Sequence, residues 1–67
     1  MKYPYPHRLV IYPKDVMAIT GQSDRSARRV LERIRRHYGK EKTALVTVEE
    51  FCRYTGLEEA FVRPFLK

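Results

Sequence analysis

Three glycines divide this chain into short segments. They lie at positions 21, 39 and 56, and each follows a run of residues with helical periodicity. Glycine adopts a left-handed backbone conformation at little steric cost, so it commonly ends a helix. The sequence therefore predicts a first helix that begins at Pro13 and ends before Gly21, since proline suits the first turn of a helix. A second helix is predicted to run to about Tyr38, before Gly39.

Capping residues set the start of two helices. Ser23 or Asp24 can cap the second helix by accepting a hydrogen bond from a free backbone N–H. Thr47 and Glu50 have the spacing of a capping box, in which each side chain accepts a hydrogen bond from the backbone N–H of the other residue. A third helix is therefore predicted from Thr47 to about Thr55.

The remaining elements are shorter. The β-prone runs 9–12 and 44–46 precede the first and third helices. A fourth helix is predicted over 57–66, and we expect Pro64 to kink or fray it because proline has no N–H to donate to Ala60. The predicted fold is mostly α, with four helices in two helix-turn-helix-like units and a minor two-stranded ribbon.

A shift of 35 positions aligns the two halves of the chain. The identical pairs are Thr20 with Thr55, Gly21 with Gly56, Arg28 with Arg63, and Leu31 with Leu66. The similar pairs are Asp15 with Glu50, Ala27 with Val62, and Val30 with Phe65. If this is a pseudo-repeat, the two extended runs are expected to pair as an antiparallel ribbon. The alternative is chance, because a shared turn chemistry would produce some of these identities.

The apolar residues predict one small core. Those expected to pack in it are Val16, Met17, Ala27, Val30, Phe51, Cys52, Leu57, Val62 and Phe65. With 67 residues the chain is predicted to form one domain, 1–67. Residues 1–8 of this domain are expected to form an extended N-terminal arm. A domain of this size buries about 60% of the surface of its unfolded chain, so a homodimer or a protein partner would add stability.

Basic charge is concentrated on the second predicted helix. The chain has 14 Lys and Arg against 8 Asp and Glu, a net charge of +6, which favours polyanionic partners. Six arginines fall within 25–36, with Glu32 as the single acid inside that stretch. At about 100° per residue, Arg25, Arg29 and Arg36 lie opposite the apolar face. The third and fourth helices instead carry Glu49, Glu50, Glu58 and Glu59 beside Arg53 and Arg63.

The turns around Thr20-Gly21 and Thr55-Gly56 resemble those of the small helix-turn-helix DNA-binding domains of bacterial repressors and excisionases. The resemblance covers about 12–31 and, less clearly, 47–66. Gln22 departs from the commonest repressor pattern, which has an apolar residue after the turn glycine. The resemblance implies that the helix near residues 23–38 enters the major groove of DNA. We expect the nucleic-acid-binding residues to be Gln22, Ser23, Arg25, Arg28, Arg29, Arg33 and Arg36.

Arginine has a planar fork that matches phosphate oxygens or the edge of guanine, which favours binding to nucleic acid. Three other interpretations remain open: RNA binding, a protein–protein adaptor whose basic helix docks on an acidic partner, and an arginine-rich face that only keeps the protein soluble. Pairing of Arg28 and Arg36 with Glu32, four residues from each, would neutralise part of the charge.

Other functions lack the residues that they need. Cys52 is the single cysteine and is expected to be a buried, inert thiol, and the two histidines and Cys52 lack metal-ligand spacing. No phosphate-binding glycine loop and no catalytic constellation is present, so we expect no enzyme activity, metal or cofactor. No apolar run approaches the roughly 20 residues of a membrane span. A cytoplasmic location is therefore expected.

Overall fold

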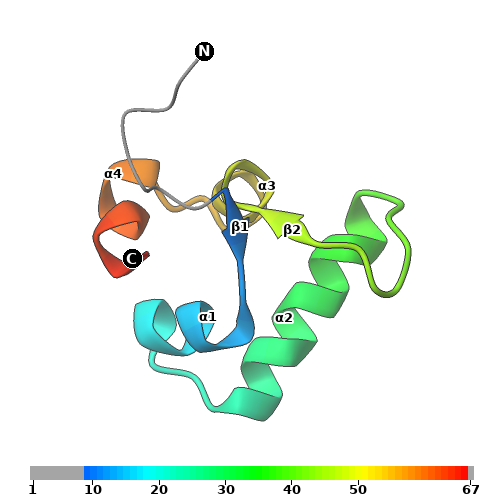
Figure 1. Ribbon diagram of the computed structural model, residues 1–67, viewed down its shortest axis with the longest axis horizontal. Coiled ribbons are helices and arrows are strands. Elements are labelled where there is room, and N and C mark those ends of the chain that lie inside the picture. Colours follow the sequence, from blue (N-terminus) through cyan, green and yellow to red (C-terminus); the bar gives the residue numbers. More distant parts are fainter. Residues whose placement is uncertain (1–8, 67) are drawn as a thin grey trace.

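A computed structural model describes residues 9–66 of the chain. Within them lie four α-helices and two short strands, the mostly helical architecture that the sequence predicts (Figure 1). In chain order they are β1 (Val10–Ile11), α1 (Pro13–Thr20), α2 (Asp24–His37), β2 (Val46–Thr47), α3 (Val48–Thr55) and α4 (Glu59–Val62), followed by the 3₁₀-helix η1 (Arg63–Phe65). The predicted N-terminal arm, 1–8, lies outside the described residues.

The two strands form the predicted antiparallel ribbon. Ile11 lies opposite Val46, and Val10 lies opposite Thr47. Ile11 and Val46 are also equivalent under the shift of 35 positions. The two halves of the repeat therefore pair with each other through equivalent residues. We call β1, α1 and α2 the first unit, and β2, α3, α4 and η1 the second unit.

The repeat extends to individual hydrogen bonds. In the first unit, four bonds join Thr20 Oγ1 to Val16 O, Gly21 N to Met17 O, Gln22 N to Thr20 Oγ1, and Tyr12 N to Asp15 Oδ2. In the second unit, the equivalent four join Thr55 Oγ1 to Phe51 O, Gly56 N to Cys52 O, Leu57 N to Thr55 Oγ1, and Thr47 N to Glu50 Oε1. Gly21 and Gly56 both take the left-handed conformation, with φ of 77° and 84°. The alignment of the two halves therefore describes a structural repeat.

The core lies between the two units. Its buried apolar residues are Ile11, Val16, Ala27, Leu31, Ile34, Val46, Val48, Phe51, Cys52, Val62 and Leu66. Of the residues predicted for the core, Met17 and Val30 are half-buried against it. The prediction was wrong for Leu57 and Phe65, which are 36% and 46% exposed.

The fourth helix explains this error. It begins at Glu59, later than predicted, and after Val62 the chain tightens into η1 around Pro64. Proline cannot donate to the carbonyl of Ala60, so the α-helix stops early, in agreement with the interruption predicted there. One turn of helix has room for one core-facing side chain, which is Val62. The tighter winding of η1 then leaves Phe65 outside and brings Leu66 into the core.

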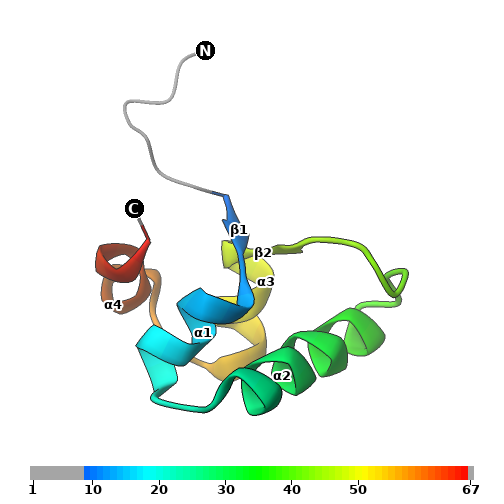
Figure 2. The same cartoon turned by 60° about the horizontal axis from the view of Figure 1, so that its bottom comes forward.

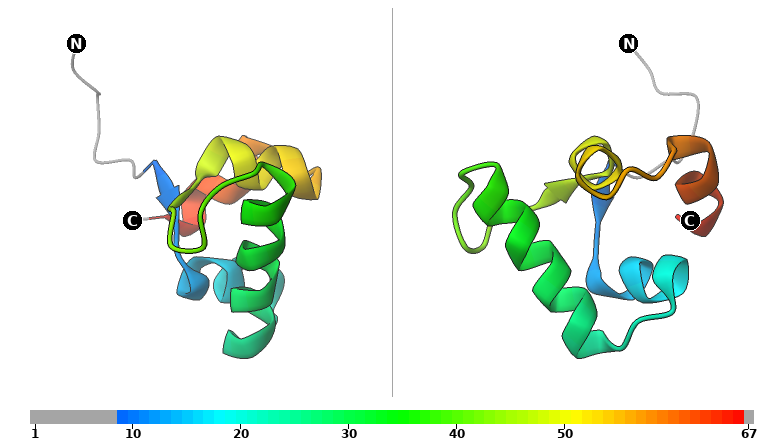
Figure 3. Two further views of the ribbon diagram at one scale, coloured as in Figure 1. Left: turned by 90° about the vertical axis from the view of Figure 1, so that its right-hand side faces the viewer. Right: turned by 180° about the vertical axis from the view of Figure 1, so that it is seen from behind.

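The two units place their second helices on opposite sides of the ribbon. Figure 2 and the right-hand view in Figure 3 show α2 as a long rod on one side of the molecule, with α4 and η1 away from it on the other. In between, α1 packs against α2 and η1, while α3 packs against α2 and α4.

Candidate nucleic-acid interface

A tight turn sets the start of α2. The left-handed Gly21 reverses the chain after α1, and the Gln22 N–H donates to Thr20 Oγ1 at 3.1 Å. Ser23, rather than Asp24, is the N-cap, because its hydroxyl oxygen accepts a hydrogen bond from the Ser26 N–H at 3.2 Å. Gln22 therefore lies at the exposed N-terminal end of α2, and Ser23 holds the helix start.

Two of the predicted site arginines form ion pairs along α2. Arg36 Nη2 lies 3.4 Å from Glu32 Oε2, the pairing expected from their spacing. Arg28 Nε instead lies 2.9 Å from Asp24 Oδ2, on the preceding turn. All four side chains are exposed, and such surface pairs contribute only about 0.2–1 kcal/mol each. Both arginines can therefore exchange their carboxylate for a phosphate at little cost.

Two other basic residues, Arg35 and Lys40, form contacts that stabilise the fold. Arg35 Nε donates to the carbonyl oxygen of Ala44 at 2.7 Å, which ties the loop after α2 back to the helix. Lys40 Nζ donates to the Leu45 carbonyl at 2.7 Å and lies 2.8 Å from Glu50 Oε1. The hydrogen bond from Lys40 lowers the pKa of Glu50. Arg35 and Ala44 lie nine positions apart in the chain, and Lys40 and Glu50 lie ten positions apart. Helical periodicity therefore gave no signal for either contact.

Arg25, Arg29 and Arg33 differ from these arginines. Each is exposed, and none forms an ion pair or a hydrogen bond with any residue between 9 and 66. Because they are four residues apart, they lie along one side of the helix. Their guanidinium groups have neither a carboxylate nor a carbonyl partner within 9–66, whereas Arg35 donates to a carbonyl.

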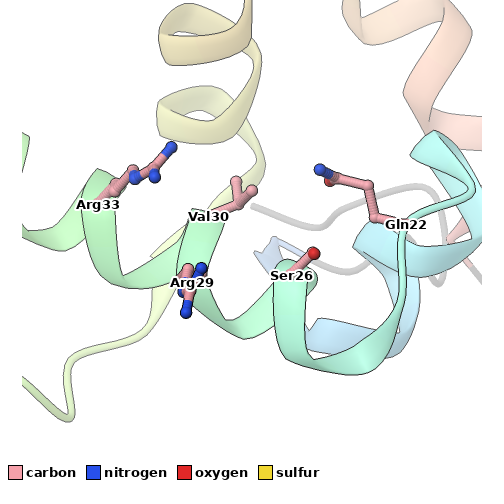
Figure 4. Close-up of a pocket in the computed structure, with 5 residues that line it drawn as sticks. All are labelled: Gln22, Ser26, Arg29, Val30 and Arg33. Carbon is pink, nitrogen blue, oxygen red and sulfur yellow. The ribbon is translucent and has the colours of Figure 1, made fainter.

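A shallow depression adjoins these arginines. Its lining residues are Gln22, Ser26, Arg29, Val30 and Arg33. Figure 4 shows Gln22, from the turn, facing the same open space as Ser26 and Val30, from α2. The free N–H groups at the start of a helix add partial positive charge there. The structure thus brings together Gln22, Arg29 and Arg33 of the predicted site, with Arg25 one turn before Arg29, while Arg28 and Arg36 form the ion pairs described above. Ser26, which the sequence did not single out, belongs to the depression.

The second unit lacks this arrangement. Its two arginines both have acidic partners: Arg53 Nη2 lies 3.3 Å from Glu49 Oε2, and Arg63 Nη2 lies 3.8 Å from Glu59 Oε2. The predicted contrast in charge between the two units is therefore also a contrast in pairing.

Three other features within 9–66 bear on function: the Cys52 thiol, possible metal ligands and the length of the helices. Burial raises the pKa of the Cys52 thiol, as does the nearby Glu59 carboxylate, so the thiol stays protonated. Among the described side chains, no three histidine, cysteine or acidic groups gather as a metal site, and none of the described helices is long and apolar enough to cross a membrane. Comparison with protein-family models, curated proteins and solved structures gave no match for this chain.

Proposed function

We propose that this protein binds DNA, as a small regulator of transcription or recombination, by inserting the N-terminal half of α2 into the major groove. The observation that supports this proposal most is the row of unpaired, exposed arginines, Arg25, Arg29 and Arg33, beside the depression that Gln22 helps to line. In the major groove, arginine pairs bidentately with guanine and glutamine with adenine. A recognition helix presents such residues at its N-terminal end.

The ion-paired arginines have a different proposed role. Arg28 and Arg36 are held by Asp24 and Glu32 until a phosphate replaces the carboxylate. Phosphate contacts fix the position of a protein on the duplex without reading its sequence. In this proposal Gln22, Arg25 and Arg29 read bases, whereas Arg28, Arg33 and Arg36 contact the backbone.

Duplex RNA suits this helix less well than duplex DNA. The major groove of A-form RNA is deep and narrow, so side chains on an inserted helix cannot read it. An acidic protein partner would be attracted by the same arginines. An experiment must therefore distinguish three classes of partner: DNA, RNA and an acidic protein.

The test begins with selection of bound sequences from a random DNA pool. Titrations of the selected duplex and of a scrambled duplex at two salt concentrations then follow, with Arg29→Ala and Arg36→Ala variants. Each neutralised phosphate releases about 0.9 counterion, so affinity should fall steeply with salt. Arg29→Ala should cost about 1–3 kcal/mol on the selected site and much less on the scrambled one, whereas Arg36→Ala should weaken both about equally.

Three outcomes contradict the proposal. A salt dependence near zero would exclude binding through phosphates. If both variants lower both affinities in the same proportion, α2 is a general polyanion contact and does not read sequence. Tighter binding to structured RNA than to any selected duplex would favour the RNA alternative.

A further inference from the structure

A second depression lies at the C-terminal end of α2, where the helix meets the loop 38–45. Its lining residues are Glu32, Arg35, Arg36, Lys40 and Lys42. We call it the basic depression, because four of its five lining residues are basic and one is acidic. An anionic group is therefore the kind of ligand that its charge favours.

The backbone at the end of α2 removes two acceptors that would oppose an anion. Gly39 has a φ of 66°, and its N–H donates to the Arg36 carbonyl at 3.2 Å. The Lys40 N–H donates to the Arg35 carbonyl at 2.8 Å. These two bonds form the Schellman arrangement that commonly ends a helix. The carbonyl oxygens of Arg35 and Arg36 thus have N–H partners beyond the helix, which offsets part of the negative charge at a helix C-terminus.

Side chains hold the loop at its other end. Arg35 Nε donates to the Ala44 carbonyl at 2.7 Å, and Lys40 Nζ donates to the Leu45 carbonyl at 2.7 Å. Figures 1 and 2 show the loop leaving the C-terminal end of α2 and returning to β2. Lys42 lies between these two attachments, so its backbone position is set by the fold.

Lys42 and Arg36 are the two basic side chains of the depression that remain available. Lys42 is exposed and forms no ion pair or hydrogen bond with any residue from 9 to 66. The Arg36 side chain is 75% exposed, and its pair with Glu32 spans 3.4 Å. Such an exposed pair contributes little, so an incoming anion can replace the carboxylate.

Helical periodicity relates the basic depression to the proposed base-reading residues. At about 100° per residue, the α2 residues of the first depression lie about 40–100° to one side of Arg29: Arg33, Ser26 and Val30. Those of the basic depression lie about 20–120° to the other side: Arg36, Glu32 and Arg35. The two depressions therefore adjoin opposite sides of one helix.

An inserted helix fills the major groove. The groove of B-DNA is about 12 Å wide and a helix with its side chains is about 10–12 Å across, so the two sides of the helix face the two phosphate strands. In the proposed complex, the side that bears the basic depression faces one of these strands.

We infer that the basic depression binds a phosphate group of the DNA backbone, with Lys42 and Arg36 as its ligands. Arg35 and Lys40 are positioning residues, since their hydrogen bonds hold the loop. A lysine on a tied loop loses less freedom on binding than one on an unattached segment, which favours the contact. This inference rests on the proposed function and adds to it a contact from the loop after α2, which positions the protein without reading sequence.

The test compares Lys42→Ala with Arg53→Ala, which removes the same charge from an exposed arginine of the second unit. A scrambled duplex is titrated by fluorescence anisotropy at about 0.05 M and about 0.2 M salt. Counterion release supplies essentially all affinity for such a duplex, and one lost phosphate contact removes about 0.9 counterion. Lys42→Ala should therefore lower affinity about 15-fold at the lower salt and about 4-fold at the higher. Arg53→Ala should lower it less than about 2-fold at both.

Two further variants separate this contact from base reading. Lys42→Arg keeps the charge and should bind as the wild type does. Lys42→Ala should weaken the selected and scrambled duplexes in the same proportion, whereas Arg29→Ala should lower the ratio of the two affinities. Circular dichroism checks that each variant is folded.

Equal effects of Lys42→Ala and Arg53→Ala on a duplex that the wild type binds would overturn the inference alone. Displacement of the duplex by inorganic phosphate at constant ionic strength would identify free phosphate as the ligand and overturn it too. So would a larger loss of affinity for polyglutamate than for the duplex in Lys42→Ala, which would identify an acidic protein. A wild type that binds both duplexes equally and loses affinity in Lys42→Ala would refute base reading and support the phosphate site. Absence of duplex binding by the wild type would refute both.

Discussion

The two units of this protein share the same backbone arrangement but differ in the chemistry of their exposed surfaces. Four equivalent hydrogen bonds and the left-handed Gly21 and Gly56 set the same backbone path in each. The exposed positions differ, since Gln22 in the first unit corresponds to Leu57 in the second. Buried positions and turn bonds fix the backbone, which leaves exposed positions free to take another chemistry.

Length is the second difference between the units. Helix α2 has 14 residues, and α4 has four. The proline that ends the α-helical geometry, Pro64, occupies the position equivalent to Arg29. A helix of one turn is too short to reach into a groove, so under the proposed function the comparison predicts that the second unit does not contact nucleic acid.

The largest effect is expected from the core positions that the repeat makes equivalent, Val16 and Phe51, both fully buried. Phe51→Ala should lower the free energy of unfolding by about 3–5 kcal/mol, much of the stability of so small a domain. Val16→Ala should cost roughly 2 kcal/mol, because it removes less buried volume. Urea denaturation measures both, and Phe51→Leu serves as a milder variant if Phe51→Ala does not fold. An equal cost for Val16→Ala and Phe51→Ala would show that the second unit contributes no more to the core than the first.

Charge reversal tests the contrast between the surfaces. Arg29→Glu removes an unpaired arginine of α2 and adds repulsion, so affinity for a DNA duplex should fall about 100-fold. Arg53→Glu, at an exposed arginine that is paired with Glu49, should change affinity less than about 3-fold. Fluorescence anisotropy with a labelled duplex gives both values. Equal losses would mean that both units contact nucleic acid.

Alanine at the two turn glycines tests whether the scaffolds are energetically alike. Gly21 and Gly56 have φ of 77° and 84°, and a Cβ added at either would meet no atom within 4 Å. Only backbone strain opposes the substitution, so each should cost about 1–2 kcal/mol. Thermal unfolding of Gly21→Ala and Gly56→Ala compares them. A difference of more than about 1 kcal/mol would show that one turn tolerates distortion better than the other.

The smallest effect concerns the ion pair between Lys40 and Glu50 at the capping box of the second unit. Glu50→Gln keeps an acceptor for the Thr47 N–H and removes the charge facing Lys40, and should cost about 0.5–1 kcal/mol near neutral pH. Urea unfolding at neutral and acidic pH measures this loss. Glu49→Gln, at an exposed pair with Arg53, is the control and should cost almost nothing.

The pH dependence follows from the same carboxylate. The folded pKa of Glu50 lies below its ordinary value near 4.5, so the stability it provides is present above that value and is lost as the pH falls through the folded pKa. The gap between wild type and Glu50→Gln should therefore narrow in acid. A gap that is constant with pH would mean that the charge of Glu50 does not contribute to stability.

The sequence by itself determined the elements and their order. Helix starts at Ser23 and Thr47, and helix ends at Gly21 and Gly56, depend on hydrogen bonds and backbone conformations within one turn of chain. Such local interactions can be read from neighbouring residues, and so can the arginine-rich side of α2, which follows from helical periodicity. The pairing of the two strands followed from the repeat.

Tertiary structure decided which side chains stay available. Arg35 is held by the Ala44 carbonyl and Lys40 by Glu50, and both contacts depend on how the loop folds back. Leu57 is exposed because it lies in the turn before α4, and Phe65 is exposed because the chain tightens into η1 after Val62. Burial and pairing between residues far apart in the chain depend on how whole elements pack, and no periodicity encodes that packing.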